Sequence, residues 1–540
     1  MATILVPTNQ ATLAAAYTAA SDNDTIVLET VGPHTMADPP SLAKKLNIQS
    51  AVDAVINALN AATDYAFRCR VGCANSELRG LIIDGGDFAR ITAESGAVVS
   101  MVDCEIKRDT ATSANYALYI QAGGRVDFAD GIIDTRGWAA RVQNGAICNI
   151  SNAEISTSNE VAVRHLSLEP GAAGGDLAVD GCDIQSGTSS SSVEALVASA
   201  IGASTFSLKN STISHASSSG HGVGVGSESA ISGGDGNVAY EITRNTITGF
   251  RGASQDLSGI IHTIFVGFNA NGPIDANTVI GGGYALVWKG TGFVNTTGYI
   301  ARNIALNCNI GLRLKGITGA LIVGNTLITR GVNSGACMTV SDDDGAGNAN
   351  GIVNVGNVYV SVDSALVCSK NGVCSFALNK NNCYICNSLS SFKIDDVAKT
   401  WAEWVAGTGE TGSFCVVKNG AAWDVYTSEA PTAVAWSLSA CPIDTATGRI
   451  VNMVGNPLLK RGAVVTGVND GGELDIWGNA TPATGLNIGA DQYDYAPGFG
   501  PWCPFDGTMP DLTLSADSPA ALKSVQAWEG LPSEATMEKY

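Results

Sequence analysis

Two pairs of acids are the residues of this sequence whose spacing could support acid–base chemistry. Asp84 and Asp87 fall in the segment IIDGGDF, where they could meet across a tight corner. Asp103 and Asp130 each follow a short apolar stretch, so they would stack if those stretches lie in neighbouring layers. Two carboxylates held close together raise the pKa of one of them, which a general acid needs. Asp at a turn also has a purely structural use, because its side chain bonds to nearby backbone. We favour that use and predict no catalytic residue here.

The densest acidic segment is DDDGAGN at residues 342–348, which begins with Asp342, Asp343 and Asp344. An oxygen-rich loop of this kind can bind Ca²⁺. Its spacing does not match a DxDxDG loop, and no basic partner is evident by position. We interpret it as a solvated turn, with a structural cation as the alternative, and predict no metal ligand and no cofactor.

Four cysteines lie close together in the sequence, at Cys368, Cys374, Cys383 and Cys386. They raise the question of zinc. Within the strand-like segment NCYICN, residues three apart point to opposite faces, so Cys383 and Cys386 cannot chelate one ion unless the strand bends. Cys104, Cys182 and Cys383 share the place after a turn residue, which favours stacking as small apolar side chains inside the fold. We interpret the cysteines as buried thiols.

The elements that would position these residues follow one repeated phrase, in which an apolar strand, an Asn or Asp corner and a second apolar strand succeed each other. Examples are MVDCEI, NISNAEI and LIVGNTLI. The predicted corners are Asp103, Asp130, Asn152, Gly181, Asn210, Asn245, Asn277, Asn303, Asn325, Asn357 and Asn382. Neighbouring corners are between 22 and 35 residues apart. That is the period of a solenoid.

Elementary conformational preferences support this interpretation. Asn and Asp tolerate left-handed backbone, so they suit a sharp corner. The flanking Ile, Val, Leu and Thr pack well on a pleated surface. A single coil cannot bury its apolar face, whereas stacked coils share one core. At ~4.8 Å per coil, about eleven coils would form a column on the order of 50 Å long. The predicted fold is therefore an all-β, single-stranded parallel β-helix.

Composition excludes several classes of partner. The 540 residues include 63 Gly and only 15% charged residues, which is typical of a turn-rich, extended β-architecture. The net charge of −20 argues against nucleic acid, whose phosphates need Lys and Arg. No run of 18 or more apolar residues occurs, so we expect no membrane partner. The first residues lack a basic n-region, so we expect no secretory signal. Synthesis in a host cytoplasm and reduced cysteines follow as expectations.

The two ends differ from the repeated region. Ala11–Ala20 has the pattern of a short amphipathic helix that would cap the first coil, and Thr25–Glu29 would form a strand. A helical piece is predicted near Asp53–Leu59. Asp395–Ala406 predicts another helix, with acids at its favourable N-terminal end. We divide the chain into an N-terminal cap (1–30), the β-helix (31–390), a mixed α/β region that closes it (391–495) and a tail rich in Pro and aromatic residues (496–540) that suits a subunit interface.

Several short signatures resemble a known superfamily. The opening ATLAAAYTAASDNDTIVLE is similar to the first-coil cap of right-handed parallel β-helix proteins of the pectin-lyase-like superfamily. TWAEWVAGTGE, GNPLL, NIGADQ and LSADSPA resemble the closing region of bacterial and phage β-helix proteins. The resemblance implies a right-handed helix over nearly the whole chain. It implies little about function, because one fold hosts lyases, hydrolases, epimerases and scaffolds.

One pair of motifs resembles those of polygalacturonase-type hydrolases, where a His and an Arg/Lys pair hold a uronate. These are Gly220-His221-Gly222 and Arg313-Leu314-Lys315. Such hydrolysis also needs two carboxylates facing each other. In that family they lie one coil before the His, yet Val197–Lys209 contains no Asp or Glu. We therefore assign no catalytic role to His221, Arg313 or Lys315.

We expect a virion protein from this combination of features. Phage structural proteins are made in the host cytosol and often form trimeric β-helices on the particle. A tailspike usually has a separate N-terminal head-binding domain, whereas the cap helix is expected here within the first dozen residues, which favours a capsid decoration (cement) protein or a spike docked by its C-terminal part. The expected partners are further copies in a homotrimer, capsid or tail proteins, and a host surface glycan. The alternative is a tailspike-type receptor-binding protein or a depolymerase that acts on host polysaccharide.

Overall fold

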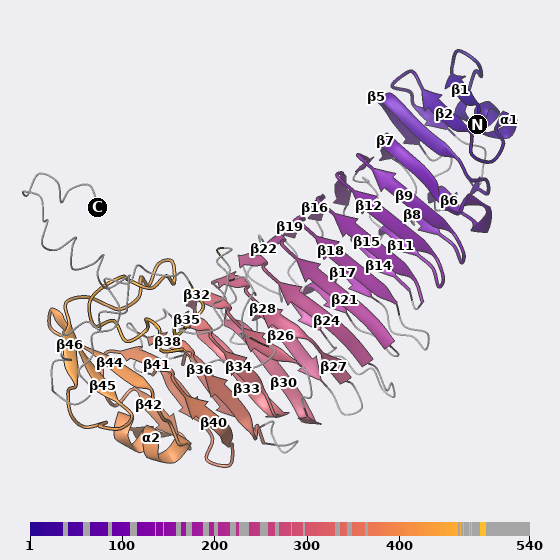
Figure 1. The fold of residues 1–540 in the computed structure, drawn as a ribbon. Coiled ribbons are helices and arrows are strands. Elements are labelled where there is room, and N and C mark those ends of the chain that lie inside the picture. The colour runs from indigo at the N-terminus through magenta and orange to yellow at the C-terminus, as the bar shows by residue number, and fades with distance from the viewer. Residues whose placement is uncertain are drawn as a thin grey trace, which may run out of the picture.

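A computed structural model of the chain describes residues 1–492, except for a set of gaps. These are residues 36–40, 58–64, 85–88, 108–115, 136, 144, 158–163, 169–174, 187–193, 199–202, 216–222, 226–236, 249–257, 265–268, 282, 295–297, 330–334, 343–347, 362–365 and, between 463 and 485, all but 465, 468, 475 and 477. The chain winds into a long column with α1 at one end and α2 near the other (Figure 1).

The column has three stacks of strands along its length. The first stack is a 15-stranded sheet: β4 (Ser41–Leu42), β6 (Tyr65–Cys69), β8 (Ala89–Ala93), β11 (Tyr116–Ile120), β14 (Trp138–Val142), β17 (Arg164–Leu168), β20 (Glu194–Ala198), β23 (Val223–Val225), β26 (Ser258–Ile264), β30 (Tyr284–Val294), β33 (Ile310–Thr318), β36 (Met338–Ser341), β39 (Cys368–Lys370), β42 (Phe392–Ile394) and β43 (Val397–Lys399). The other two stacks belong to one 31-stranded sheet.

The second stack lies before each corner. It holds β1 (Thr3–Val6), β2 (Thr25–Leu28), β9 (Val98–Val102), β12 (Arg125–Ala129), β15 (Ile147–Ser151), β18 (Asp176–Asp180), β21 (Ala203–Lys209), β24 (Asn237–Thr243), β27 (Asn269–Asn271), β28 (Pro273–Asp275), β31 (Tyr299–Ala301), β34 (Leu321–Val323), β37 (Ile352–Val355) and β40 (Phe376–Lys380). The long strands β5 (Asn47–Asn57) and β7 (Ser76–Asp84) run through the corner into the third stack.

The third stack lies after each corner. It holds β3 (His34–Thr35), β10 (Glu105–Ile106), β13 (Ile132–Thr135), β16 (Glu154–Thr157), β19 (Asp183–Ser186), β22 (Thr212–His215), β25 (Thr246–Thr248), β29 (Thr278–Ile280), β32 (Ile304–Cys308), β35 (Thr326–Thr329), β38 (Val358–Ser361), β41 (Cys383–Cys386) and β44 (Phe414–Asn419). The antiparallel strands β45 (Ala422–Thr427) and β46 (Trp436–Leu438) extend it.

Parallel pairing between successive coils confirms the predicted parallel β-helix. Residues of β12 pair in register with β9 on one side and with β15 on the other, so that Phe128 lies between Met101 and Ile150. Side chains alternate along each strand, and every second one enters a continuous apolar interior. The right-handedness that the resemblance implies stays a prediction.

The corners explain which residue types the repeat allows. Asp103, Asp130, Asn152 and Asn210 have φ between 49° and 55°, in the left-handed region that Asn and Asp tolerate best. In later coils the left-handed residue is instead Arg244, Ala276, Arg302, Gly324, Gly356 or Asn381. The predicted corners from Asn245 to Asn382 are therefore wrong by one position. Each of these asparagines directly follows the left-handed residue and is buried.

Both ends of the interior are closed by a helix. Helix α1 (Leu13–Ala19) confirms the predicted N-terminal cap; Thr12 accepts a hydrogen bond from the Ala15 N–H (3.1 Å), and Leu13 is buried. Helix α2 (Trp401–Thr408) starts later than predicted, because Asp395 and Asp396 form a left-handed turn between β42 and β43. Thr400 and Glu403 form a capping box instead. The predicted helix near Asp53 is wrong: this part of the chain lies in β5.

The region after α2 packs against the outside of the third stack. Every residue of β35, β38 and β41 is buried, since one face lines the interior and the other meets a second apolar cluster that includes Ile443, Leu458 and Ile488. Its backbone is also tied to the coils, through a bond from the Gly489 N–H to the Gly356 carbonyl (2.7 Å). The four-part division of the chain stays a prediction, and the tail 496–540 lies outside the described residues.

Candidate functional site

The predicted acids Asp103 and Asp130 lie together on one surface groove, which we call the corner groove. It has a volume of about 360 Å³ and follows the corner over several coils. Its lining is Asp53, Gly80, Leu81, Ile82, Asp103, Cys104, Glu105, Asp130, Gly131, Ile132, Asn152 and Glu154. Five of these residues are acidic and none is Lys or Arg, so the groove is strongly negative.

The acids of the corner groove are used as turn residues. Asp103 and Asp130 are exposed left-handed corners on successive coils, and the Asn152 amide donates to Asp130 Oδ1 (3.1 Å). Similar bonds separate acids elsewhere on the exterior: Asn149 Nδ2 donates to Asp127 Oδ1 (2.6 Å). Placing a neutral donor beside each of these carboxylates limits repulsion between stacked like charges. The structural use of the corner acids is thus supported.

The remaining acid candidates are dispersed. Asp84 is half-buried at the end of β7, and its partner Asp87 lies outside the described residues. Asp342 accepts a hydrogen bond from Asn371 Nδ2 (2.6 Å), which ties it to the next coil. Asp343 and Asp344 also lie outside the part of the chain that the structure describes. Among the described residues, no group of three His, Cys, Asp or Glu side chains is arranged to hold a metal ion.

The cysteines of the described residues are thiols held inside or beside the coils. Cys386 belongs to the interior cluster and Cys383 to the outer cluster, which confirms that they point to opposite faces. Cys104 and Cys182 share the interior position after the corner, but Cys383 does not, because its corner is Asn381. Burial raises the pKa of the Cys104 thiol to about 11 and holds that of Cys383 well above its ordinary value. Thiolates are the reactive form, so these cysteines are inert.

The basic motif on β33 is engaged with its own sheet. Arg313 Nη1 donates to the Tyr284 hydroxyl (2.8 Å), and the guanidinium lies 5.3 Å from the centre of that ring. Lys315 lies two residues further on the same strand, in register with Ser341 of the next coil. His221, the other part of this candidate, lies outside the described residues.

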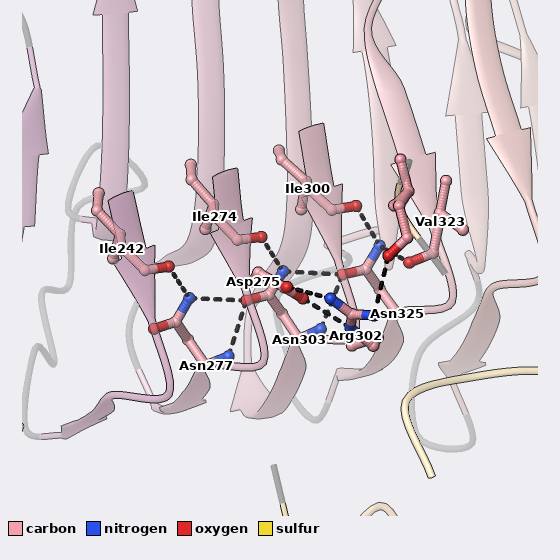
Figure 2. A network of polar contacts seen from close by, with 10 residues as sticks. Ile242, Ile274, Asp275, Asn277, Ile300, Arg302, Asn303, Val323 and Asn325 are labelled. Carbon is pink, nitrogen blue, oxygen red and sulfur yellow. Dashed lines mark hydrogen bonds and ion pairs between the residues drawn. The ribbon is translucent and has the colours of Figure 1, made fainter. Parts of the chain in front are cut away.

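The buried asparagines form a ladder along the inside of the corner. In Asn245, Asn277, Asn303, Asn325 and Asn357, Nδ2 donates to Oδ1 of the next asparagine at 2.9, 2.9, 3.0, 2.9 and 3.3 Å, ending at Asn382. Each of these Oδ1 atoms also accepts the backbone N–H of the preceding asparagine, and each Nδ2 donates to a carbonyl one coil back (Figure 2). Every hydrogen-bonding atom of these amides thus works between coils.

A buried ion pair lies beside this ladder. The Arg302 guanidinium contacts both oxygens of Asp275 on the preceding coil, with Nε 2.9 Å from Oδ1 (Figure 2). Its Nη1 donates to the Val468 carbonyl (2.9 Å), in the segment that covers the coils. Arg302 is 2% exposed and Asp275 8%. The pair therefore joins two coils and the C-terminal segment in one contact.

A cluster of rings and one guanidinium occupies the outer face of the first stack, and we call it the aromatic–arginine face. Tyr116 and Tyr119 stack with ring centres 5.4 Å apart, and Trp138 meets Tyr116 edge-on at 5.5 Å. The Arg141 guanidinium lies 5.0 Å from the Tyr116 ring and 5.5 Å from the Tyr119 ring. Gln143 Nε2 donates to the Tyr119 hydroxyl (2.7 Å). The five side chains are partly exposed.

Sequence reasoning missed this face. The four residues come together because β11 stacks on β14 without a shift, so that Tyr116 pairs with Trp138 and Tyr119 with Arg141. The two strands begin 22 residues apart, the same step that separates the corners Asp130 and Asn152. Aligning coils by the corner would therefore have shown the four residues side by side.

Comparisons with known proteins identify no family for this chain. No protein-family model matches it, and no curated protein matches it. Among solved structures it is similar to the crystal structure of pectate lyase Pel9A, with 10% identity over 92% of this chain and 97% of that chain, at a TM-score of 0.24. Because that score is low, the β-helix assignment rests on the strand pairing itself. None of the helices in the described ranges has the length and apolar character needed to cross a membrane.

Proposed function

We propose that this protein is a structural rod on the surface of a phage particle, a trimeric capsid decoration protein that stabilises the shell. The observation that carries the proposal is the asparagine ladder, which runs through six consecutive coils from Asn245 to Asn382. Its amides are committed to bonds between coils, which rigidifies a column rather than forming a reaction centre. A mechanical role on a particle exposed to the environment requires such resistance to unfolding.

Further features support a virion component. The exterior is acidic, and the net charge of −20 opposes self-aggregation at high local concentration. The described cysteines are all free thiols, most of them buried, as suits a protein that folds in a reducing cytosol. The trimer, the capsid partner and the virion location belong to this proposal.

The first test compares phage particles that carry the protein with particles from which its gene has been deleted. We expect the deleted particles to lose genome at a lower temperature, and purified protein to restore the original temperature when added back. Mass spectrometry of the purified particles measures the copy number, which for a decoration protein is comparable to that of the capsid protein. Deleted particles that keep full heat stability but no longer adsorb to host cells would contradict the decoration role.

A tailspike-type receptor-binding protein is the second candidate, and the aromatic–arginine face favours it. Sugars present apolar C–H faces that pack on aromatic rings, while their hydroxyls bond to phenol and amide groups. Trp138, Tyr119 and Gln143 offer these groups on two adjacent coils. Arg141 adds a positive charge to an otherwise acidic protein.

For this candidate we expect Trp138→Ala to weaken binding to purified host surface polysaccharide roughly tenfold, since truncating an anchoring Trp of a binding surface typically costs more than about 1 kcal/mol. Binding is measured by calorimetry, and chain length is followed by gel filtration. The matched control is Trp477→Ala, which removes a ring that also lies over an arginine, 4.6 Å from Arg449, but in the C-terminal region. Equal binding by both variants and the wild type would exclude the aromatic–arginine face as the glycan site.

A further inference from the structure

The asparagine ladder ends at a buried carboxyl group. Gly409 closes α2 in the left-handed conformation (φ 69°), which turns the chain inward and places Glu410 against the last coils. The side chain is buried, with the residue 3% exposed. A carboxyl group in such a place needs several hydrogen-bond donors or a proton.

The described residues supply Glu410 with hydrogen-bond donors but with no cation. Its Oε1 accepts from Asn382 Nδ2 (2.8 Å) and from the Ser413 hydroxyl (2.5 Å), and its Oε2 accepts from the Tyr384 hydroxyl (2.8 Å). All three donors are neutral. Among the contacts that the described residues make with this carboxyl, none comes from Lys, Arg or His.

The ladder has one direction, and that direction leads to Glu410. Each asparagine donates one Nδ2 hydrogen toward the C-terminal end, to the next asparagine or, from Asn382, to Glu410, while its Nδ2 also donates to a carbonyl one coil back. The side-chain amides therefore form one chain of hydrogen bonds whose donors lead to the carboxyl. Aligned hydrogen bonds polarise one another. The ladder therefore lessens the free-energy cost of a carboxylate at this point, without removing it.

The groups that surround Glu410 do not exchange protons in the physiological range. Tyr384 of β41, Tyr359 of β38 and Cys368 of β39 face this part of the interior, and burial holds the pKa of each well above its ordinary value. The Trp404 ring of α2 packs on Tyr384 at 6.3 Å. Burial also raises the pKa of Glu410, while the donors of Ser413, Asn382, Tyr384 and Trp404 oppose that rise. Glu410 is the group of this cluster that gains or loses a proton.

We propose that Glu410 is a proton-controlled latch for the C-terminal cap of the rod. With a proton on Glu410 the cluster is neutral, and the Tyr384 hydroxyl can reverse to accept the new O–H. Without the proton, a negative charge lies between the last coil and α2, where the described residues place no cation against it, and separating α2 from the coil lets water reach it. Acid therefore tightens the cap and alkali loosens it.

Proton linkage determines the direction in which pH changes the stability of the cap. A carboxyl group whose pKa is higher in the folded than in the unfolded state favours folding while it is protonated. Its contribution is present at low pH and is lost as the pH rises through the raised value. Loosening the cap would expose the rings of Trp401, Trp404 and Phe392. In the closed cap the Phe392 ring centre lies 5.5 Å from that of Trp401 and 5.3 Å from that of Trp404, and all three rings pack around Tyr384 at 5.3 to 6.3 Å.

The test is hydrogen exchange of the α2 amides in the full chain between pH 4.5 and 9, corrected for the intrinsic effect of pH. In the wild type we expect the opening constant to rise with pH between the ordinary carboxyl pKa and the raised pKa of Glu410, by at most about tenfold per pH unit, because opening releases one proton in that range, and to level off above it. Glu410→Gln keeps the shape and the acceptor oxygen, so its opening constant should stay constant with pH. Acrylamide quenching of tryptophan fluorescence reports the same opening independently.

The matched control is Glu403→Gln, which changes the exposed capping-box acid of the same helix. Hydrogen bonds from the Thr400 backbone and side chain lower the pKa of Glu403, so its loss should weaken α2 without removing the alkaline loosening. Tyr384→Phe removes one donor and should shift the wild-type transition upward in pH while keeping its slope. A wild-type cap that opens equally at all pH values, or a Glu410→Gln cap that still loosens in alkali, overturns the proposal.

Discussion

We expect Asn303→Ala to unfold the middle of the rod before either end. The substitution leaves the Asn277 backbone N–H without its acceptor, removes one of the two bonds of Asn277 Nδ2, and leaves the Ile274 carbonyl without its donor. An unsatisfied buried polar group costs about 1–3 kcal/mol, so the free energy of unfolding should fall by roughly 3 kcal/mol or more. Urea denaturation followed by circular dichroism measures the change.

The position of the damage distinguishes this effect from general loss of stability. A solenoid coil contacts only its neighbours, so hydrogen exchange should accelerate in the coils that carry Asn277 and Asn325 and much less near α1. The control Asn149→Ala removes an amide that bonds to Asp127 on the outer surface and should change stability by less than about 1 kcal/mol. Equal losses for the two variants would show that the ladder has no special importance.

The corners illustrate how far the sequence alone can lead. Asp103 and Asn152 were placed correctly, because their residue types are those that adopt left-handed backbone at low cost. In later coils the same Asn signal occurs one residue further on, and it reflects burial in a ladder rather than backbone conformation. Arg302 and Ala276 occupy the left-handed position of their coils, but the sequence does not indicate this, because neither residue type favours left-handed backbone. The ladder itself, not an intrinsic preference, holds them there.

The candidate site was less predictable than the fold, since a site on a solenoid depends on register between coils. The corner groove could be anticipated, because Asp103 and Asp130 occupy the same point of successive repeats. The aromatic–arginine face requires in addition that β11 stacks on β14 without a shift. Glu410 carries no signal of its own: it looks like a polar residue after a helix until the last coil is placed against it.

The burial pattern of the third stack could also be partly predicted from the sequence. The segments TLIT, VYVS and CYIC are buried on both faces, whereas Glu154 in β16 is exposed. A near-continuous apolar strand in a parallel sheet indicates cover on its outer side. The sequence of these strands therefore indicated that something lies over the second half of the rod, although not that residues after α2 supply it.

The second large effect concerns the ion pair that fastens this cover. We expect Arg302→Met to lower the free energy of unfolding by about 3–5 kcal/mol, because Asp275 stays buried and loses the guanidinium that contacts both of its oxygens. Methionine keeps the length of the side chain and has a similar cost in left-handed backbone, so the change isolates the guanidinium. The Val468 carbonyl also loses its donor. Limited proteolysis should therefore release fragments cut near residue 468 sooner than in the wild type.

Two further variants show whether the pair fastens the cover or is merely tolerated. Combining Arg302→Met with Asp275→Leu removes both charges, and replacing a buried pair by apolar side chains is often neutral in stability. The double variant should regain most of the lost stability while the segment around Val468 stays sensitive to protease, because its donor is still missing. Arg125→Met is the matched control, since the exposed Arg125–Asp127 pair should contribute less than about 1 kcal/mol. A double variant with wild-type resistance to protease would show that apolar packing alone holds the C-terminal segment on the coils.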